Sequence, residues 1–229
     1  MPSKLSSATG GNSGTASSYT VNASAITGTG MIAAISIYSS TITVSTVVQT
    51  NCVWVRATST SIAASGTTEL WYCLSAGSSP GSVVTITLSG SNFGSGATVI
   101  VYDTPFTGLD QIASASGTSS TAPNTGTTPT TTNTNELFIG CISLIDTGGA
   151  GESFGTMTNG FLTVSETDTN GTSLFGPLLH HGSFQLLSNS LTTASTTAQF
   201  ASVNYTGVIA TMIFGITPNT RRRISGSFL

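Results

Sequence analysis

Few residues of this sequence are of types that do chemistry, and their spacing points to no catalytic or metal site. His180 and His181 are adjacent, so in an extended strand their side chains point to opposite faces, and we expect one packed and one exposed histidine. The glycine-rich run 146–155 holds two carboxylates, but its spacing does not match an EF-hand loop and favours a surface turn. Asp103 and Asp110 flank a turn, and we expect both to hydrogen-bond to its backbone.

Enzymatic activity finds no support in the sequence. A glycosidase needs two carboxylates about 5–10 Å apart across a sugar, whereas the eight acidic residues are scattered, mostly at expected turns. Serine and threonine supply 78 of the 229 residues, so no hydroxyl stands out as a nucleophile, and no Gly-x-Ser-x-Gly motif occurs. We therefore expect no enzyme, no catalytic residues, no metal site and no cofactor.

The cysteines and tryptophans lie within apolar runs. Cys52, Cys73 and Cys141 are odd in number, and their spacing matches no zinc pattern. We expect buried free thiols, with one disulfide-bonded pair as the alternative. Trp54 and Trp71 are the candidates for stacking on sugar rings if they are exposed, although aromatic residues in apolar strands are more often buried.

Charge is scarce and unevenly placed. Charged residues make up 6% of the chain, against about 25% in an ordinary globular protein. Residues 1–220 contain all eight acidic residues but only Lys4 and Arg56 as basic ones. The other positive charges are Arg221, Arg222 and Arg223, a run too short to indicate nucleic-acid binding. We expect these three arginines to be solvated or to contact an acidic neighbour during assembly, and Arg56 to pair with a carboxylate that the sequence does not identify.

No secretory or membrane segment is visible. The first 18 residues contain one lysine with no apolar run behind it, and no stretch approaches the ~20 apolar residues of a membrane helix. We expect synthesis in a cytoplasm and release without a classical secretion signal, for example by particle assembly followed by lysis.

The periodicity of the apolar residues predicts an all-β protein organised around the region 69–111. Residues 83–88 alternate Val, Ile and Leu with Thr, and residues 97–103 repeat the pattern, with a glycine-rich turn expected between them and a loop expected after them. Good polar helix formers are nearly absent. About ten strands at regular spacing predict a jelly-roll-like β-sandwich, with two smaller β-modules as the alternative.

The composition also suggests how the chain is divided. Residues 1–18 are small and polar and predict a flexible N-terminal arm, and residues 218–229 a basic C-terminal tail. The β-sandwich would then occupy residues 19–217. Within it, the threonine-rich stretch 117–134 has no apolar residue larger than alanine and is the best candidate for an internal boundary.

The central motifs resemble those of a family of β-rich proteins encoded in the structural regions of tailed phages and prophages. The resemblance lies in five motifs, at residues 70–72 (LWY), 84–88 (VTITL), 99–102 (VIVY), 109–111 (LDQ) and 135–140 (NELFIG). The sequence departs from the family at residues 102–104, where Tyr-Asp-Thr replaces Tyr-Ser-Gly, and at residues 51–54, which replace a Gly-Asn-Thr-Trp element. The flanks match poorly.

The resemblance implies a fold and a setting rather than an active site. It implies a jelly-roll-like structural component of a bacteriophage virion, most simply a capsid decoration (cement) protein. Such a protein would associate with itself, as a trimer, and with the major capsid protein. The alternative is a carbohydrate-binding or adhesion module of the tail or fibre, whose partner would be a host surface glycan. Neither hypothesis implies a membrane or a nucleic acid as a partner.

Overall fold

The computed structural model describes residues 2–63, 66–145, 154–167, 179–188, 197 and 202–215. These residues form β-strands, turns and loops, and none of them lies in a helix that could cross a membrane. The strands are β1 (Lys4–Asn22), β2 (Gly30–Ile37), β3 (Val44–Val48), β4 (Val55–Ile62), β5 (Gly66–Cys73), β6 (Val83–Tyr102), β7 (Phe106–Ser120), β8 (Glu136–Ile145), β9 (Leu162–Thr167), β10 (Leu179–Ser188) and β11 (Val203–Phe214).

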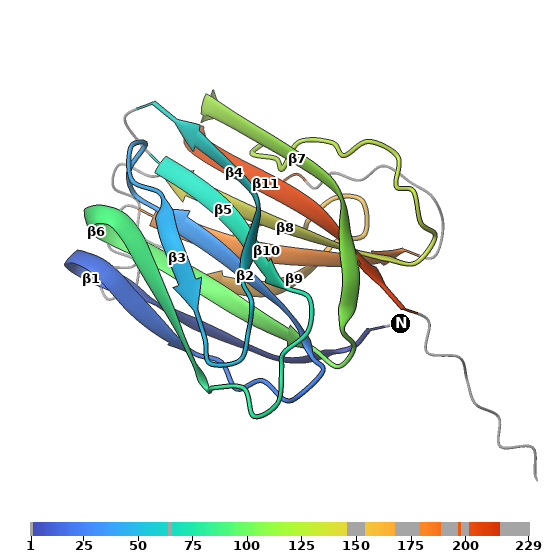
Figure 1. Cartoon of the computed structure of the whole chain (residues 1–229). Coiled ribbons are helices and arrows are strands. Elements are labelled where there is room, and N and C mark those ends of the chain that lie inside the picture. The colour runs from blue at the N-terminus through green and yellow to red at the C-terminus, as the bar shows by residue number, and fades with distance from the viewer. Residues whose placement is uncertain are drawn as a thin grey trace, which may run out of the picture.

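The strands form two antiparallel sheets that pack face to face (Figure 1). The first sheet has the order β1-β6-β2-β5-β4, with β3 paired to β6 beside this path, and the second has the order β7-β11-β8-β10-β9. The predicted all-β sandwich of about ten strands is therefore confirmed. The chain completes the first sheet before it begins the second, and a shared apolar core between the sheets joins the two halves.

The central strands are apolar on both faces because both faces are covered. In β2, Met31, Ala33 and Ile35 belong to one core, and Ile32 and Ala34 to the other. A strand that alternates between two cores needs a continuous apolar run rather than the polar–apolar alternation of a half-exposed strand. The same reason explains the uninterrupted apolar run of β8, which is buried along its whole length.

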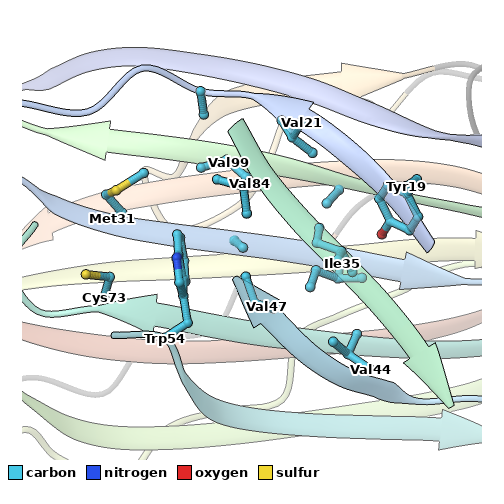
Figure 2. Packing of buried hydrophobic residues seen from close by; sticks show 14 of the residues in the cluster. Tyr19, Val21, Met31, Ile35, Val44, Val47, Trp54, Cys73, Val84 and Val99 are labelled. Atoms are coloured by element: carbon cyan, nitrogen blue, oxygen red, sulfur yellow. The ribbon is translucent and has the colours of Figure 1, made fainter. Parts of the chain in front are cut away.

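The outer face of the first sheet is covered by the chain folding back over it. We call this cover the outer leaf, and it consists of β3, residues 83–91 of β6 and residues 15–22 of β1. At Gly10 the first half of β1 passes so close to Thr20 in its second half that a Cβ atom would collide with the carbonyl oxygen. Figure 2 shows Tyr19 and Val84 of the outer leaf in the same apolar core as Met31 of the first sheet.

The glycine-rich segment between residues 89 and 96 bends a strand instead of ending it. We predicted a turn here, but β6 runs from Val83 to Tyr102, and β1 pairs with both of its halves. Gly94 takes a φ of 90°, a left-handed conformation that favours glycine, so the bend occurs where the backbone permits it. The predicted loop after residue 103 is also largely strand, because β7 pairs with β11 over Phe106–Ser120.

The threonine-rich stretch divides no domains. Its first residues, up to Ser120, belong to β7, and the following residues bond to the second sheet at Asn124 and Thr132. At Gly207 of β11 the backbone of Asn124 comes so close that any side chain would collide with it. Both neighbouring strands, β7 and β8, belong to the second sheet, so the predicted internal boundary at 117–134 is wrong. The change from one sheet to the other occurs earlier, at residues 103–105.

The predicted flexible N-terminal arm is instead most of a strand. Residues 4–12 pair with the C-terminal half of β6 in the first sheet, and Asp103 fixes the start of the strand by accepting a hydrogen bond from the Ser3 amide at 2.7 Å. The small polar residues suggested an arm because they supply little apolar surface of their own. They are ordered by backbone pairing, which does not depend on side-chain type.

Candidate functional site: buried polar clusters and an apolar end

A polar cluster lies in the middle of the sandwich, between the two sheets. His181 of β10 hydrogen-bonds through Nδ1 to Ser36 Oγ of β2 at 2.7 Å, and through Nε2 to Thr98 Oγ1 of β6 at 3.0 Å. Ser36 also contacts Ser143 of β8, and Thr68 of β5 connects Ser143 to Thr206 of β11. Three of these residues come from the first sheet and three from the second, so the cluster ties the sheets together across an otherwise apolar core.

The polar cluster is too deeply buried for a substrate to reach it. A serine hydroxyl beside an imidazole is the nucleophile–base arrangement of many hydrolases. Here Ser36 and His181 are both 0% exposed, as are the residues that surround them, so no substrate reaches the hydroxyl. The arrangement is therefore a structural one, in which buried polar groups satisfy one another. The expected packed histidine is His181; the side chain of His180 lies outside the described residues.

A second polar site lies on the outer face of the second sheet, where two carboxyl groups meet. Asp110 of β7 accepts hydrogen bonds from the amide and the hydroxyl of Thr132, at 2.6 and 2.7 Å. Glu136, the first residue of β8, is 1% exposed and lies beside Asp110 and Thr211 of β11. Its carboxylate oxygens have no well-aligned hydrogen-bond donor within the described residues. Asp110 therefore anchors the threonine-rich segment at Thr132, while the buried Glu136 remains poorly solvated.

The two carboxyl groups differ in proton affinity. Burial is the main cause that raises the pKa of Glu136, to about 7, and the negative charge of Asp110 raises it further. For Asp110, partial burial acts upward, but hydrogen bonds that include those from Thr132 outweigh it and lower the pKa. Glu136 therefore takes up and releases its proton in the neutral pH range, whereas Asp110 is ionised there. Carboxyl pairs with separated pKa values serve as acid and base in enzymes, but Glu136 is too buried to touch a substrate.

Glu69 of β5 forms a third cluster, under the outer leaf. Its carboxylate, 0% exposed, accepts hydrogen bonds from the Val44 amide at 2.9 Å and from Trp71 Nε1 at 2.8 Å. Arg56 lies 3.9 Å away, so the partner that the sequence left open is Glu69. Burial raises the pKa of Glu69, although these hydrogen bonds and the charge of Arg56 act in the other direction. The cluster fixes β3 to the first sheet.

The two tryptophans do not form an exposed platform for a sugar. Trp54 is 9% exposed and lies inside the core beneath the outer leaf (Figure 2). Trp71 is partly buried, and its indole nitrogen is engaged with Glu69. A sugar-stacking site needs an open aromatic face, and the geometry of these two residues does not provide a coplanar exposed pair.

The three cysteines are free thiols, as predicted. Burial raises the pKa of Cys52 to about 11 and that of Cys141 to about 12, so both thiols are protonated at neutral pH. Cys73 lies close to Cys52 and is itself buried. A protonated buried thiol is a poor nucleophile and metal ligand. Within the described parts of the chain, no group of three or more His, Cys, Asp or Glu residues is placed to hold a metal ion.

Some predicted site residues lie outside the described residues. These are the arginines Arg221, Arg222 and Arg223, and the two carboxylates of the glycine-rich run, Asp146 and Glu152. Their assembly or surface-turn roles stay predictions.

Six of the ten exposed large apolar side chains of the described residues lie at one end of the sandwich, which we call the apolar end. Three loops meet there and are joined by backbone hydrogen bonds, including Gly28 N to Ala76 O at 2.8 Å and Gly77 N to Asn51 O at 2.7 Å. These loops, residues 23–29, 49–54 and 74–81, contain no charged residue. The exposed apolar residues on the loops and on the strand ends beside them are Ile26, Val48, Val53, Val55, Leu74 and Val83.

The sequence pattern did not reveal the apolar end. Ile26, Val53 and Leu74 lie far apart in the chain, and each is a single apolar residue within a polar or glycine-rich loop. Only the hydrogen bonds between the loops place the three residues on one surface, with Ile26 63% and Val53 77% exposed.

A shallow depression lies at the other sheet, over β9 and β10. Its volume is about 200 Å³, and it is lined by Gly160, Leu162, Gln185, Leu186 and Leu187. Ligand pockets are usually about 300–1,000 Å³ with several convergent polar groups, so this depression is a weak candidate for a small-molecule site.

Comparison of the chain with protein-family models, with curated proteins and with solved structures found no match.

Proposed function

We propose that this protein is a structural subunit of a tailed-phage virion, a capsid decoration protein that binds other virion proteins through the apolar end. The observation that carries the proposal is the concentration of six exposed, large apolar side chains on or beside three loops that contain no charged residue. Contiguous apolar patches of this kind mark sites of protein–protein contact. The resemblance of residues 69–140 to phage structural proteins supplies the setting.

The build of the apolar end suits a permanent contact. Its loops are held by main-chain hydrogen bonds to one another, and the Gln49 side chain donates to the carbonyl oxygens of Ala23 and Gly81, at 3.2 and 2.7 Å. A surface that is already ordered loses little conformational entropy when a partner binds. The absence of charge in these loops fits a partner surface that is likewise neutral and apolar, as subunit interfaces in assemblies commonly are.

The alternative, a glycan-binding module of the tail or fibre, finds no support in the described geometry. Its candidate residues Trp54 and Trp71 are buried and partly buried.

The experiment that tests the proposal is incorporation into particles. The chain, with the variant I26S/V53S/L74S beside it, is co-expressed with the major capsid protein encoded in the same phage or prophage. Purified particles are then analysed for the bound chain. We expect the wild type to co-purify with the particles and the triple variant to be lost at least tenfold. The matched control is I112S/L162S, which replaces exposed apolar residues away from the apolar end.

Two results would refute the proposal. Particles that never retain the wild-type chain would contradict a decoration role, and equal retention of both variants would contradict contact through the apolar end. Thermal unfolding of each purified variant shows whether the variant is still folded, so that loss of binding can be told apart from misfolding.

A further inference from the structure

The outer edge of β1 is a long row of main-chain hydrogen-bonding groups that no strand of the described residues pairs with. β1 is 19 residues long and is the last strand of the first sheet on this side. Within the described residues no strand pairs with it other than β6. On the opposite side of the sandwich, the edge strands β4 and β7 lie against each other (Figure 1).

Within the run Ser6–Asn12, β1 lacks the features that normally block such an edge, and the register shifts of β1 lie outside this run. Edge strands are usually protected by charged side chains, by proline, by short length or by a covering segment. β1 contains no proline, and Lys4 at its beginning is its one charged residue. The run Ser6–Asn12 pairs with Val101–Ser95 without a break in register, so its outer edge is regular over about 20 Å. A regular, uncharged edge is able to accept a further strand.

We propose that β1 pairs with β1 of a second copy of the chain, antiparallel about Ala8, so that the two first sheets join into one continuous sheet. An antiparallel pair of identical strands has a two-fold axis, and such a contact closes as a dimer instead of growing into a fibre. In this register Ser7 of one copy lies opposite Thr9 of the other, and Lys4 lies opposite Asn12 of the other.

The side chains of β1 fit this register better than a parallel one. Ala8 and Gly10 face the core beneath the outer leaf, so Ser7, Thr9 and Gly11 lie on the opposite face of the strand. These three residues are small, so those of the two copies can lie opposite one another without a clash. A parallel pairing in register would place the two Lys4 side chains beside each other, and like charges directly opposite destabilise a sheet. The antiparallel pairing separates them along the strand.

This inference goes beyond the proposed function and does not rest on it, because it concerns the edge of the first sheet rather than the apolar end. In a particle, a two-fold contact of this kind would join neighbouring oligomers. Loss of particle incorporation in the apolar-end variant would leave the pairing of β1 untouched.

The test uses charge to read the register. In the variant S7K/T9K, each introduced lysine lies opposite an introduced lysine of the other copy, twice in each dimer. In the variant S7K/T9E, each lysine lies opposite a glutamate instead. We expect sedimentation equilibrium of the full chain to show a wild-type species at twice the chain mass of 23.1 kDa. The dissociation constant should rise at least tenfold in S7K/T9K and return towards the wild-type value in S7K/T9E.

Amide hydrogen exchange adds a local readout. In the wild type, the amides of residues 6–12 that face away from β6 should become protected as the protein concentration rises, and in S7K/T9K they should not. A wild-type chain that is monomeric at all concentrations would overturn the proposal. The proposal would also be overturned if S7K/T9K formed an assembly of the same mass as the wild type. It would equally be overturned if S7K/T9K and S7K/T9E raised the dissociation constant by the same factor.

Discussion

The carboxyl pair at the outer face of the second sheet should make the stability of this protein fall as the pH rises towards neutrality. Glu136 has a pKa of about 7 in the folded chain, against an ordinary value of 4.5. Below pH 4.5 the group is protonated in both the folded and the unfolded chain and contributes no difference. Between pH 4.5 and 7 the unfolded chain releases this proton while the folded chain keeps it, so the free energy of unfolding decreases. The loss is complete once the pH has risen about one unit above the pKa of the folded state.

The size of the effect follows from the two pKa values. A difference between 4.5 and about 7 corresponds to a loss of about 3 kcal/mol, which is a large part of the ~5–15 kcal/mol that stabilises a typical domain. Asp110 acts in a different range. Because its pKa is lowered, its contribution is present above its ordinary pKa and is lost only as the pH falls through the lowered value. The two groups therefore do not cancel between pH 5 and 8.

The assay is urea unfolding of the wild type and of Glu136→Gln at intervals from pH 4.5 to 8.5. Near pH 4.5 the two proteins should be similarly stable, since a protonated carboxyl and an amide are both neutral. At pH 8 the variant should be more stable by up to about 3 kcal/mol. Glu69 also has a raised pKa, so the wild type retains some pH dependence of the same sign, and the difference between the two proteins isolates Glu136.

A matched control is Asp103→Asn, which replaces an exposed carboxyl at the edge of the first sheet. It shows how far the loss of one exposed carboxyl group by itself changes the free energy of unfolding between pH 5 and pH 8. If Glu136→Gln keeps the pH slope of the wild type, the carboxyl pair is not its source, and the reasoning from the burial of Glu136 beside Asp110 is refuted.

Three further substitutions test the interior of the fold. Trp54→Ala removes a large side chain from the core beneath the outer leaf and should cost about 3–5 kcal/mol by urea unfolding, whereas a cost below about 1 kcal/mol would mean that this indole is not packed. Ser36→Ala removes the hydroxyl that hydrogen-bonds His181 and should cost about 1–3 kcal/mol, and a neutral result would contradict the role of the cluster between the sheets. Gly207→Ala places a methyl group against the backbone of Asn124 and should displace the segment 121–135. The displacement should be seen as faster proteolytic cleavage within that segment. An unchanged cleavage rate would contradict the packing of the segment on the second sheet.

Much of the fold follows from local sequence. The alternation in residues 83–88 and the apolar runs of β2, β8 and β11 predict strands because side chains on a strand alternate between its faces. Val53 and Val55 are exposed and Trp54 is buried, so neighbouring side chains also alternate between inside and outside around Trp54. The scarcity of Glu, Lys and Arg likewise excluded a helical protein. These inferences succeed because each depends on residues that are close together in the chain.

The sequence misled where a local signal has two structural outcomes. A glycine-rich run at residues 89–96 permits either a turn or a bend, and the pairing of β1 along both halves of β6 selects the bend. Small polar residues at the N-terminus permit either an arm or an edge strand, and β6 again decides.

The site residues show the same division. Sequence alone favoured a carboxylate partner for Arg56, free cysteines over one disulfide-bonded pair, and one packed histidine. Only the tertiary structure decided that Glu69 is the partner of Arg56 and that His181 joins the two sheets. It also brought Asp110 to Glu136 and gathered the loops of the apolar end. These pairings form between residues far apart in the chain, and their positions depend on strand order and register, which no local pattern encodes.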